Sequence, residues 1–337
     1  MIRLAVVGTS HITDLLLGGA RLTGRYTLTA VVSRDPARGR ALLDRHSSLA
    51  ARDACVYPSV EALCQGGAAD AVYIASPNGL HPSQARLCLE RGLHVLCEKP
   101  IVTRAEEFVS LCSLARERGL VYMEAIIPPH TPGRQKLLDA LALLGPLRTV
   151  VLDYSQYSSR LESYLAGTPT NVFEMSMHGG TLMDLGVYCV WGAIDLLGVP
   201  DAVRDASATY LPGGADGAGN AVLSYPTFDC RLSYCKTKQG TLGSRFVGEG
   251  GTLTVSMISL YSGATLSLKS GETREILGSP SREELMAGET TSFADYIEHP
   301  AETAAAYGRI TEATLAVHRV MDQIKAKAGL VYPARKQ

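Results

Sequence analysis

The chain has 337 residues, of which 46% are hydrophobic and 19% are charged. This composition is typical of a compact globular protein and excludes an extended disordered chain. At roughly 150 residues per domain, the length predicts about two domains, each large enough for its own core. The 32 Lys and Arg residues nearly balance the 33 Asp and Glu residues, so the basic surface of a general nucleic-acid binder is missing. We therefore expect a small-molecule partner and no nucleic acid.

The eight cysteines are scattered and contain no Cys-x-x-Cys pair. This favours small buried side chains over a zinc site or a disulfide framework. The first residues carry one basic side chain and an apolar stretch too short for a secretory signal. No later segment approaches about 18 uninterrupted apolar residues, the length of a membrane span. We expect a cytoplasmic protein with no metal and no membrane partner.

The N-terminal part of the chain alternates short apolar strands with helices. Strands that are apolar throughout and separated by helices are typical of a parallel sheet buried on both faces. The pattern predicts an α/β domain over residues 1–125, with a doubly wound, Rossmann-type parallel sheet. The expected strands are 4–7, 28–32, 71–75, 94–97 and 120–123, and the expected helices are 12–17, 38–44, 82–91 and 105–118.

The pattern changes after Pro128-Pro129. A helix is expected over 133–144, a strand over 149–157 and a strongly apolar helix over 182–197. Short strands with glycine-containing turns then follow, which indicates hairpins of a large, mainly antiparallel sheet. We predict an α+β domain over 126–337. Its later elements are strands at 207–211, 221–225, 228–235, 245–247, 252–255 and 265–268, and a helix at 303–326.

The turn after the first strand is a candidate dinucleotide-binding loop. Gly8 is the first glycine of a G-x-G-x-x-G pattern, while Ser10 and Thr13 stand where the other two glycines would be. Glycine allows the backbone to approach a pyrophosphate held at a helix N-terminus. A plain strand-to-helix turn also explains such a partial match, and its place at the start of a βαβ unit favours the cofactor. The expected cofactor-binding residues are Gly8, Thr9, Ser10, His11 and Ile12.

The residues after the second strand indicate which dinucleotide binds. An NAD-selective site usually has a carboxylate there, which binds the ribose 2′-hydroxyl. This chain has Ser33 and Arg34 instead, and a guanidinium can bind a 2′-phosphate through bidentate hydrogen bonds. The alternative for Arg34 is a solvated turn residue beside Asp35. The pair nevertheless favours NADP, with NAD as the alternative.

Two further motifs carry a resemblance to a known family. One runs from Ser76-Pro77-Asn78 to Glu98-Lys99-Pro100, and the other runs from Gly179 to Tyr188. Together they resemble the signatures of the Gfo/Idh/MocA oxidoreductases, named for glucose-fructose oxidoreductase, inositol dehydrogenase and rhizopine catabolism. The resemblance covers nearly the whole chain and implies a nicotinamide cofactor. It implies that the cofactor contacts Ser76, Pro77, Asn78, His81, Glu98 and Lys99.

The second motif contains the candidate catalytic side chains. Asp184 and Tyr188 are four residues apart on an expected helix, so both project from one face. A nearby ammonium lowers the pKa of a tyrosine hydroxyl, as a base acting near neutral pH requires. The resemblance implies that Lys99 and Tyr188 meet at the nicotinamide, as in the glucose-fructose oxidoreductase, xylose dehydrogenase and dihydrodiol dehydrogenase branch. Core packing for Tyr188, a surface position for Lys99 and a merely orienting role for Asp184 are the alternatives.

Arg160 and His178 are further candidates for substrate binding, together with Asp184 and Tyr188. Arg160 follows the strand over 149–157, and His178 precedes a double glycine. Each could also be an ordinary structural residue. Phe173-Glu174-Met175 departs from the acidic-proline sequence of many family members, so the resemblance does not predict the shape of this loop.

The sequence thus predicts an NADP(H)-preferring oxidoreductase acting on a hydroxyl or carbonyl carbon of a sugar, polyol or cyclic diol. Two alternatives are a family member that uses bound NAD transiently to cleave glycosides, and a non-catalytic dinucleotide sensor. The family resemblance also implies a homodimer or homotetramer formed through the C-terminal sheet.

Overall fold

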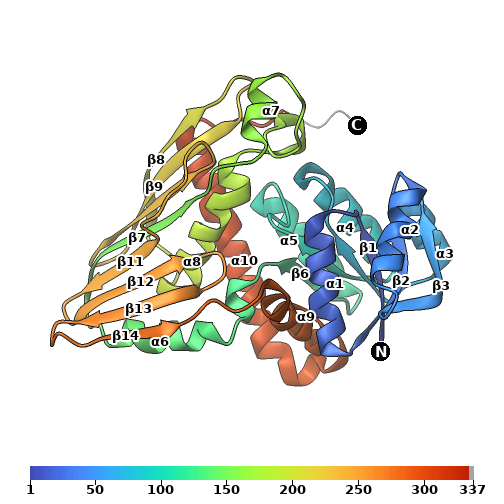
Figure 1. Ribbon diagram of the computed structural model, residues 1–337, viewed down its shortest axis with the longest axis horizontal. Coiled ribbons are helices and arrows are strands. Elements are labelled where there is room, and N and C mark those ends of the chain that lie inside the picture. Colours follow the sequence, from blue (N-terminus) through green and yellow to red (C-terminus); the bar gives the residue numbers. More distant parts are fainter. Residues whose placement is uncertain (334–337) are drawn as a thin grey trace. The chain divides into compact units, whose positions relative to one another are not determined.

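The computed structural model describes residues 1–333, which form two compact units (Figure 1). The first unit contains Met1–His130 and Ser281–Thr311, and the second contains Thr131–Pro280 and residues 312–333. The expected boundary at residue 125 assigned everything after it to one C-terminal domain. Residues 281–311 instead pack with the N-terminal unit.

A six-stranded, all-parallel sheet forms the centre of the first unit, in the order β3-β2-β1-β4-β5-β6. This is the expected Rossmann-type sheet, with its topological switch between β1 and β4. The edge strand β3 and the following α3 were not predicted, because β3 is half-exposed and lacks a continuous apolar run. The strands are β1 (Ile2–Val7), β2 (Tyr26–Val32), β3 (Ala50–Tyr57), β4 (Ala71–Ile74), β5 (His94–Glu98) and β6 (Tyr122–Ala125).

The helices of the first unit follow the strands in alternation, as a doubly wound sheet requires. A short 3₁₀ turn at Asn78–Leu80 precedes α4, and another at Pro128–His130 follows β6. The helices are α1 (His11–Thr23), α2 (Pro36–Arg45), α3 (Val60–Gly66), α4 (His81–Glu90), α5 (Ala105–Glu117), α9 (Arg282–Glu298) and the first part of α10 (Pro300–Ala328).

Helix α9 is held in the first unit by α1 and the start of β2. A Cβ atom added to Gly19 of α1 would lie 2.6 Å from the Cβ of Met286, so the two helices are in close contact. The Tyr26 hydroxyl donates a hydrogen bond to the Thr290 carbonyl at 2.6 Å, and Arg25 forms ion pairs with Asp295 and Glu298 of α9. These contacts explain why residues distant in sequence belong to the N-terminal unit.

The second unit contains an eight-stranded sheet in the order β14-β13-β12-β11-β7-β10-β9-β8. Neighbouring strands are antiparallel except β7 and β10, which are parallel. The expected large, mainly antiparallel sheet is confirmed. Its strands are β7 (Leu147–Ser155), β8 (Ala202–Tyr210), β9 (Asp216–Ser224), β10 (Asp229–Cys235), β11 (Ser244–Gly248), β12 (Gly251–Met257), β13 (Ser262–Leu268) and β14 (Thr273–Leu277).

An apolar helix packs against this sheet. The segment begins with a π-helical turn, η4 (Leu182–Gly186), and continues as α8 (Val187–Leu197), where the sequence predicted one regular helix. By length and composition Met175–Leu197 could cross a membrane, but 78% of its most apolar window is buried, so the core accounts for its hydrophobicity. The other helices here are α6 (Gly133–Ala142), α7 (Leu161–Leu165), a 3₁₀ turn at Met175–Met177 and the remainder of α10.

Candidate active site

In the first unit, the turn after β1 lies against the loop that follows β4. Gly8 has a φ of +103°, and a Cβ atom there would lie 2.8 Å from the Ala75 carbonyl oxygen. A side chain at this position is therefore excluded both by backbone conformation and by space. Ser10 is the N-cap of α1, and its hydroxyl accepts no N–H of the helix, which leaves the helix N-terminus suited to bind a phosphate group.

The end of β2 has a free cationic side chain next to an engaged carboxylate. Asp35 is the N-cap of α2, and its carboxylate accepts hydrogen bonds from the N–H groups of Ala37 and Arg38. Ser33 donates through its hydroxyl to the Asp35 carbonyl at 2.7 Å. Arg34 is exposed, and no ion pair of residues 1–333 involves its guanidinium. The nearby carboxylate thus stabilises the helix and leaves Arg34 available for a ligand.

His81 joins two of the segments that contain expected cofactor residues. Its side chain is fully buried, with Nδ1 2.9 Å from the Pro100 carbonyl oxygen and Nε2 2.8 Å from the Ser76 carbonyl oxygen. Burial lowers its pKa, and a neutral imidazole donates through one nitrogen alone. His81 therefore lies between the loop after β4 and the Lys99-Pro100 segment and donates to one of the two carbonyls, and its contact with a cofactor stays a prediction.

Three carboxyl groups lie close to the end of β5. Glu98 accepts a hydrogen bond from the Tyr73 hydroxyl, and the buried Glu124 accepts one from the Ile101 N–H at 2.9 Å. Glu289 of α9 is 1% exposed, and burial raises its pKa well above the usual range, with further rises from Glu98 and Glu124. Burial also raises the pKa of Glu98, while the positive charge of Lys99 opposes that rise. A concentration of acidic groups therefore surrounds the backbone next to Lys99.

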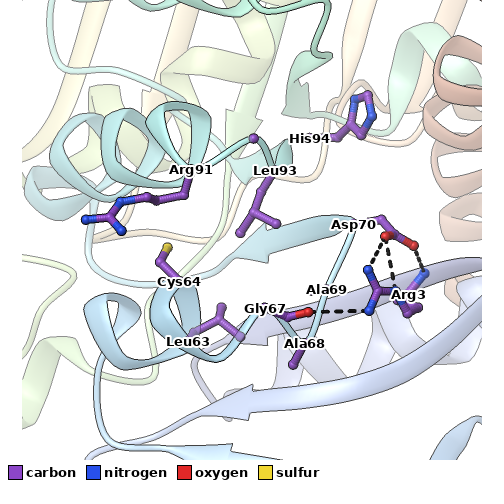
Figure 2. Close-up of a pocket in the computed structure, with 11 residues that line it drawn as sticks. Arg3, Leu63, Cys64, Gly67, Ala68, Ala69, Asp70, Arg91, Leu93 and His94 are labelled. Atoms are coloured by element: carbon purple, nitrogen blue, oxygen red, sulfur yellow. Dashed lines mark hydrogen bonds and ion pairs between the residues drawn. The ribbon is translucent and has the colours of Figure 1, made fainter.

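A cavity of about 330 Å³ opens at the opposite edge of this sheet (Figure 2). It lies at the amino ends of β1, β4 and β5, where Arg3 binds Asp70 at 2.6 Å and His94 begins its strand. Ligands of open α/β sheets bind at the carboxyl ends of the strands. The cavity is therefore distinct from the edge that contains Gly8, Arg34 and Lys99.

In the second unit, η4 and α8 present two polar side chains from an apolar segment. From Thr181 to Ile194, every residue is buried except Asp184 and Tyr188. The Tyr188 ring packs edge-on against Tyr154 of β7, with ring centroids 5.6 Å apart. The two candidate catalytic residues of this unit thus share one open face, as their spacing predicted.

The double glycine before this helix is required by its surroundings. A Cβ atom on Gly179 would lie 2.7 Å from the Asn171 carbonyl oxygen, and one on Gly180, at a φ of +120°, would lie 2.0 Å from Asp216 Oδ1. Asp216 is fully buried and accepts the Leu182 N–H at 2.6 Å. Its carbonyl accepts the Thr181 hydroxyl at 2.7 Å. Asp216 therefore anchors the first turn of the helix that carries Asp184.

Asp184 forms an ion pair with Lys236, the residue after β10. The Lys236 side chain is 8% exposed and the Asp184 side chain is 33% exposed. Burial raises the pKa of Asp216 to about 7, and hydrogen bonds and the charge of Lys236 oppose that rise. Two carboxyl groups of this unit thus interact with one ammonium.

The remaining candidates, His178 and Arg160, lie on neighbouring loops of the second unit. His178 has a φ of +55°, and its ring stacks on Tyr332 with centroids 4.8 Å apart. Arg160 is exposed at the start of α7. Leu161 of this helix packs against Phe173 of the loop leading to His178. The packing connects the two loops, and contact of either side chain with a substrate stays a prediction.

The sequence analysis missed Lys236, Asp216, Glu124 and Glu289. Lys236 continues the inward alternation of Leu232 and Tyr234, and that was the one available signal for its burial. Within residues 1–333, no three His, Cys, Asp or Glu side chains form a group suited to a metal ion.

Comparisons with known proteins agree with these features. The family model described as "Oxidoreductase family, NAD-binding Rossmann fold" (GFO_IDH_MocA) matches residues 2–126. The chain is 33% identical over 335 residues to scyllo-inositol 2-dehydrogenase (NADP(+)) IolU of Bacillus subtilis, covering 99% of each chain. It is 34% identical over 339 residues to the uncharacterized oxidoreductase YgjR of Escherichia coli, covering 99% of this chain and 98% of YgjR.

A solved structure shares the fold over nearly the same length. KijD10, a 3-ketoreductase from Actinomadura kijaniata solved with NADP and TDP-benzene, superposes with a TM-score of 0.83 at 22% identity. The superposition covers 97% of both chains.

Proposed function

Because the chain belongs to the Gfo/Idh/MocA family of oxidoreductases, we propose that it is an NADP(H)-preferring dehydrogenase or reductase. It transfers a hydride between a nicotinamide and a hydroxyl or carbonyl carbon of a sugar, polyol or cyclic diol. One observation supports Asp184 and Tyr188 as functional residues: they are the two residues that are not buried in the otherwise buried stretch from Thr181 to Ile194. Core packing would bury both side chains, whereas catalysis requires both to be accessible.

The first unit has features that fit a dinucleotide. The Gly8 turn, where a Cβ atom would meet Ala75, and the N-terminus of α1 suit a pyrophosphate. We assign this group to Gly8, Thr9, Ser10, His11 and Ile12.

The preference for NADP rests on the end of β2. Ser33 and the exposed Arg34 would bind a 2′-phosphate, because Asp35 is engaged at the N-cap of α2. The relative IolU is named as NADP(+)-dependent, which supports the same choice. At the carboxyl ends of β4 and β5, the residues assigned to the cofactor are Ser76, Pro77, Asn78, His81, Glu98 and Lys99.

Three side chains have different roles in the proposed reaction. When bound, the nicotinamide supplies the hydride acceptor in oxidation and the hydride donor in reduction. Tyr188 takes the proton of the substrate hydroxyl in oxidation and returns it in reduction. Lys99 stabilises the negative charge that develops on the same oxygen. Asp184 accepts a hydrogen bond from the substrate and so orients it.

The substrate class follows from polar groups suited to hydroxyls. Asp184, Arg160 and His178 provide acceptors and donors in the second unit, and IolU is named for a cyclic polyol. We therefore favour a polyhydroxylated ring or chain. A site built to bind several hydroxyl groups discriminates strongly against analogues that lack them.

We also propose that copies of the chain associate through the eight-stranded sheet as a homodimer or homotetramer in the cytoplasm. Helices α8 and α6 contact strands of this sheet. The outward residues of β7, β10 and β11 include the half-buried Val151, Ser233 and Val247, together with the exposed Arg231 and Arg245. Small and β-branched side chains beside charged ones suit a sheet-to-sheet contact with a partly polar interface. Sedimentation equilibrium of wild type and Val247→Asp tests this: the variant should shift towards monomer, and a monomeric wild type would contradict it.

The function is tested with a panel of aldoses, polyols and cyclic diols, followed by nicotinamide absorbance with each cofactor in both directions. We expect stoichiometric formation of NADPH during oxidation of at least one class. Glycoside cleavage without net NADPH formation would favour the hydrolase alternative. Tight dinucleotide binding without turnover on any substrate would favour the sensor.

A further inference from the structure

Lys236 is a buried cation at the inner face of the second unit. It directly follows β10, in which Leu232 and Tyr234 point inward and are 1% exposed. Side chains alternate along a strand, and Lys236 continues the inward set. A lysine at such a position is costly unless a negative charge compensates it.

The backbone around Lys236 is held on both sides. Its N–H donates to the Gly217 carbonyl at 2.8 Å, and its carbonyl accepts from the Ser158 N–H at 2.9 Å. Because Gly217 follows Asp216, the same contact brings Lys236 next to the residue that anchors η4. The base of the side chain is therefore fixed to β9 and to the loop after β7.

The head of the side chain reaches Asp184. The ammonium pairs with Oδ2 of Asp184, while 33% of the Asp184 side chain remains exposed against 8% for Lys236. The cation thus supports the carboxylate from inside the unit, and the accessible part of the pair belongs to the carboxylate.

We propose that Lys236 is a positioning residue for the reaction: it holds Asp184 in one orientation, so that the carboxylate accepts a hydrogen bond from a substrate hydroxyl. This inference rests on the proposed function. The ammonium binds Oδ2 while a third of the Asp184 side chain stays exposed, so the paired carboxylate is still accessible to a ligand. The pair therefore selects substrates that donate a hydroxyl next to the reacting carbon, and it leaves proton transfer to Tyr188.

The experiment compares Lys236→Met with Lys238→Met, since Lys238 is exposed two residues further on. We expect Lys236→Met to lower kcat/KM about 10²-fold, mostly through KM, because a misplaced orienting group costs about that much. The dissociation constant of NADPH should stay within about twofold. Lys236→Arg, which keeps the charge, should recover part of the loss, and Lys238→Met should match wild type.

A double variant separates positioning from general destabilisation. Asp184→Asn removes the ion pair of the buried ammonium, so the urea midpoint of this variant should fall, and adding Lys236→Met should recover part of that fall. In kcat/KM the double variant should be no worse than the poorer single variant. If Lys236→Met alone does not fold, kcat/KM of the double variant is compared with that of Asp184→Asn. A further tenfold loss of kcat/KM in the double variant overturns the inference.

Unchanged kcat/KM in Lys236→Met, or an equal loss in Lys238→Met, would overturn the inference and leave the proposed function intact. A wild-type protein that turns over no substrate of the panel would overturn both.

Discussion

The two units arrange their candidate functional groups by different physical means. In the first unit, the groups suited to bind the cofactor phosphates belong mostly to the main chain: the Gly8 turn and the N-terminus of α1 offer N–H groups. In the second, side chains from a single helix and an adjacent strand end, Asp184, Tyr188 and Lys236, provide the chemistry. Backbone sites depend on conformation and space, whereas side-chain sites depend on individual functional groups. Substitutions should therefore fail for different reasons in the two units.

The largest effect is expected from removing a single hydroxyl in the second unit. Tyr188→Phe should keep the fold and NADPH binding while kcat falls by about 10²- to 10⁴-fold, the range for a lost acid-base group. Lys99→Met should also be severely impaired. Because both serve one proton transfer, the double variant should be scarcely worse than the poorer single variant.

Single-turnover hydride transfer and its pH profile check this prediction. We expect the oxidation rate of wild type to rise with pH, and we expect this rise to be absent in Tyr188→Phe. Near-normal hydride transfer in Tyr188→Phe would instead mean that Tyr188 is a packing residue, and His178 would become the next candidate for the acid-base group.

In the first unit, the matching test changes space around the backbone. Gly8→Ala should cost about 2–4 kcal/mol of unfolding free energy, because it combines an unfavourable φ with a clash against Ala75. Gly24 also has a positive φ, but a Cβ atom there would have no neighbour within 4 Å, so Gly24→Ala should cost only about 1 kcal/mol. Urea unfolding measures both, and equal costs would show that close approach to Ala75 is unimportant.

The pH dependence of stability tests the buried carboxyl of the second unit. Burial raises the pKa of Asp216 from 3.8 to about 7, so between these values the folded chain holds a proton that the unfolded chain has released. Proton binding by Asp216 therefore stabilises the folded chain. This contribution to the unfolding free energy is fully present below the unfolded pKa and is lost as pH rises through 7. From pH 5 to pH 8 the loss should be about 2–3 kcal/mol.

Asp216→Asn cannot release this proton, so its stability should fall less than that of wild type over the same pH range. Urea unfolding of both proteins at pH 5 and pH 8 provides the comparison. Parallel pH profiles would mean that Asp216 is already ionised throughout.

The smallest effect is expected at the exposed end of β2. Arg34→Ala should weaken NADP(H) binding by about 1.5–3 kcal/mol, the range for a charge-assisted contact, with little effect on NAD(H). Arg40→Ala, an exposed arginine on α2, controls for the change in net charge. Isothermal titration with both cofactors measures this, and equal losses for NADP(H) and NAD(H) would contradict a contact with the 2′-phosphate.

Several features could be predicted from local sequence. Continuous apolar runs separated by helices indicated the parallel strands β1, β2, β4, β5 and β6, because burial on both faces requires apolar residues at successive positions. The four-residue spacing placed Asp184 and Tyr188 on one face, and this remained true although the first turn is π-helical. The family motifs between Ser76 and Tyr188 then indicated the class of reaction.

Other features depended on contacts between distant residues. Nothing local assigned α9 to the first unit, because that packing is produced by Gly19 and Tyr26 far away in the chain. Helical periodicity likewise cannot reveal the π-helical turn at Leu182–Gly186 or the Asp216 carboxylate that accepts the Leu182 N–H.

The sequence by itself therefore determined the Rossmann-type sheet, the mainly antiparallel sheet and the accessible pair on one helix. Tertiary structure alone decided which charged residues are buried and what lies beside them: Lys236 is paired with Asp184, whereas Glu289 lies near Glu98, which further raises the pKa of Glu289. The physical reason is that periodicity reports where apolar side chains are removed from water. A buried charge is instead tolerated according to partners brought together by folding.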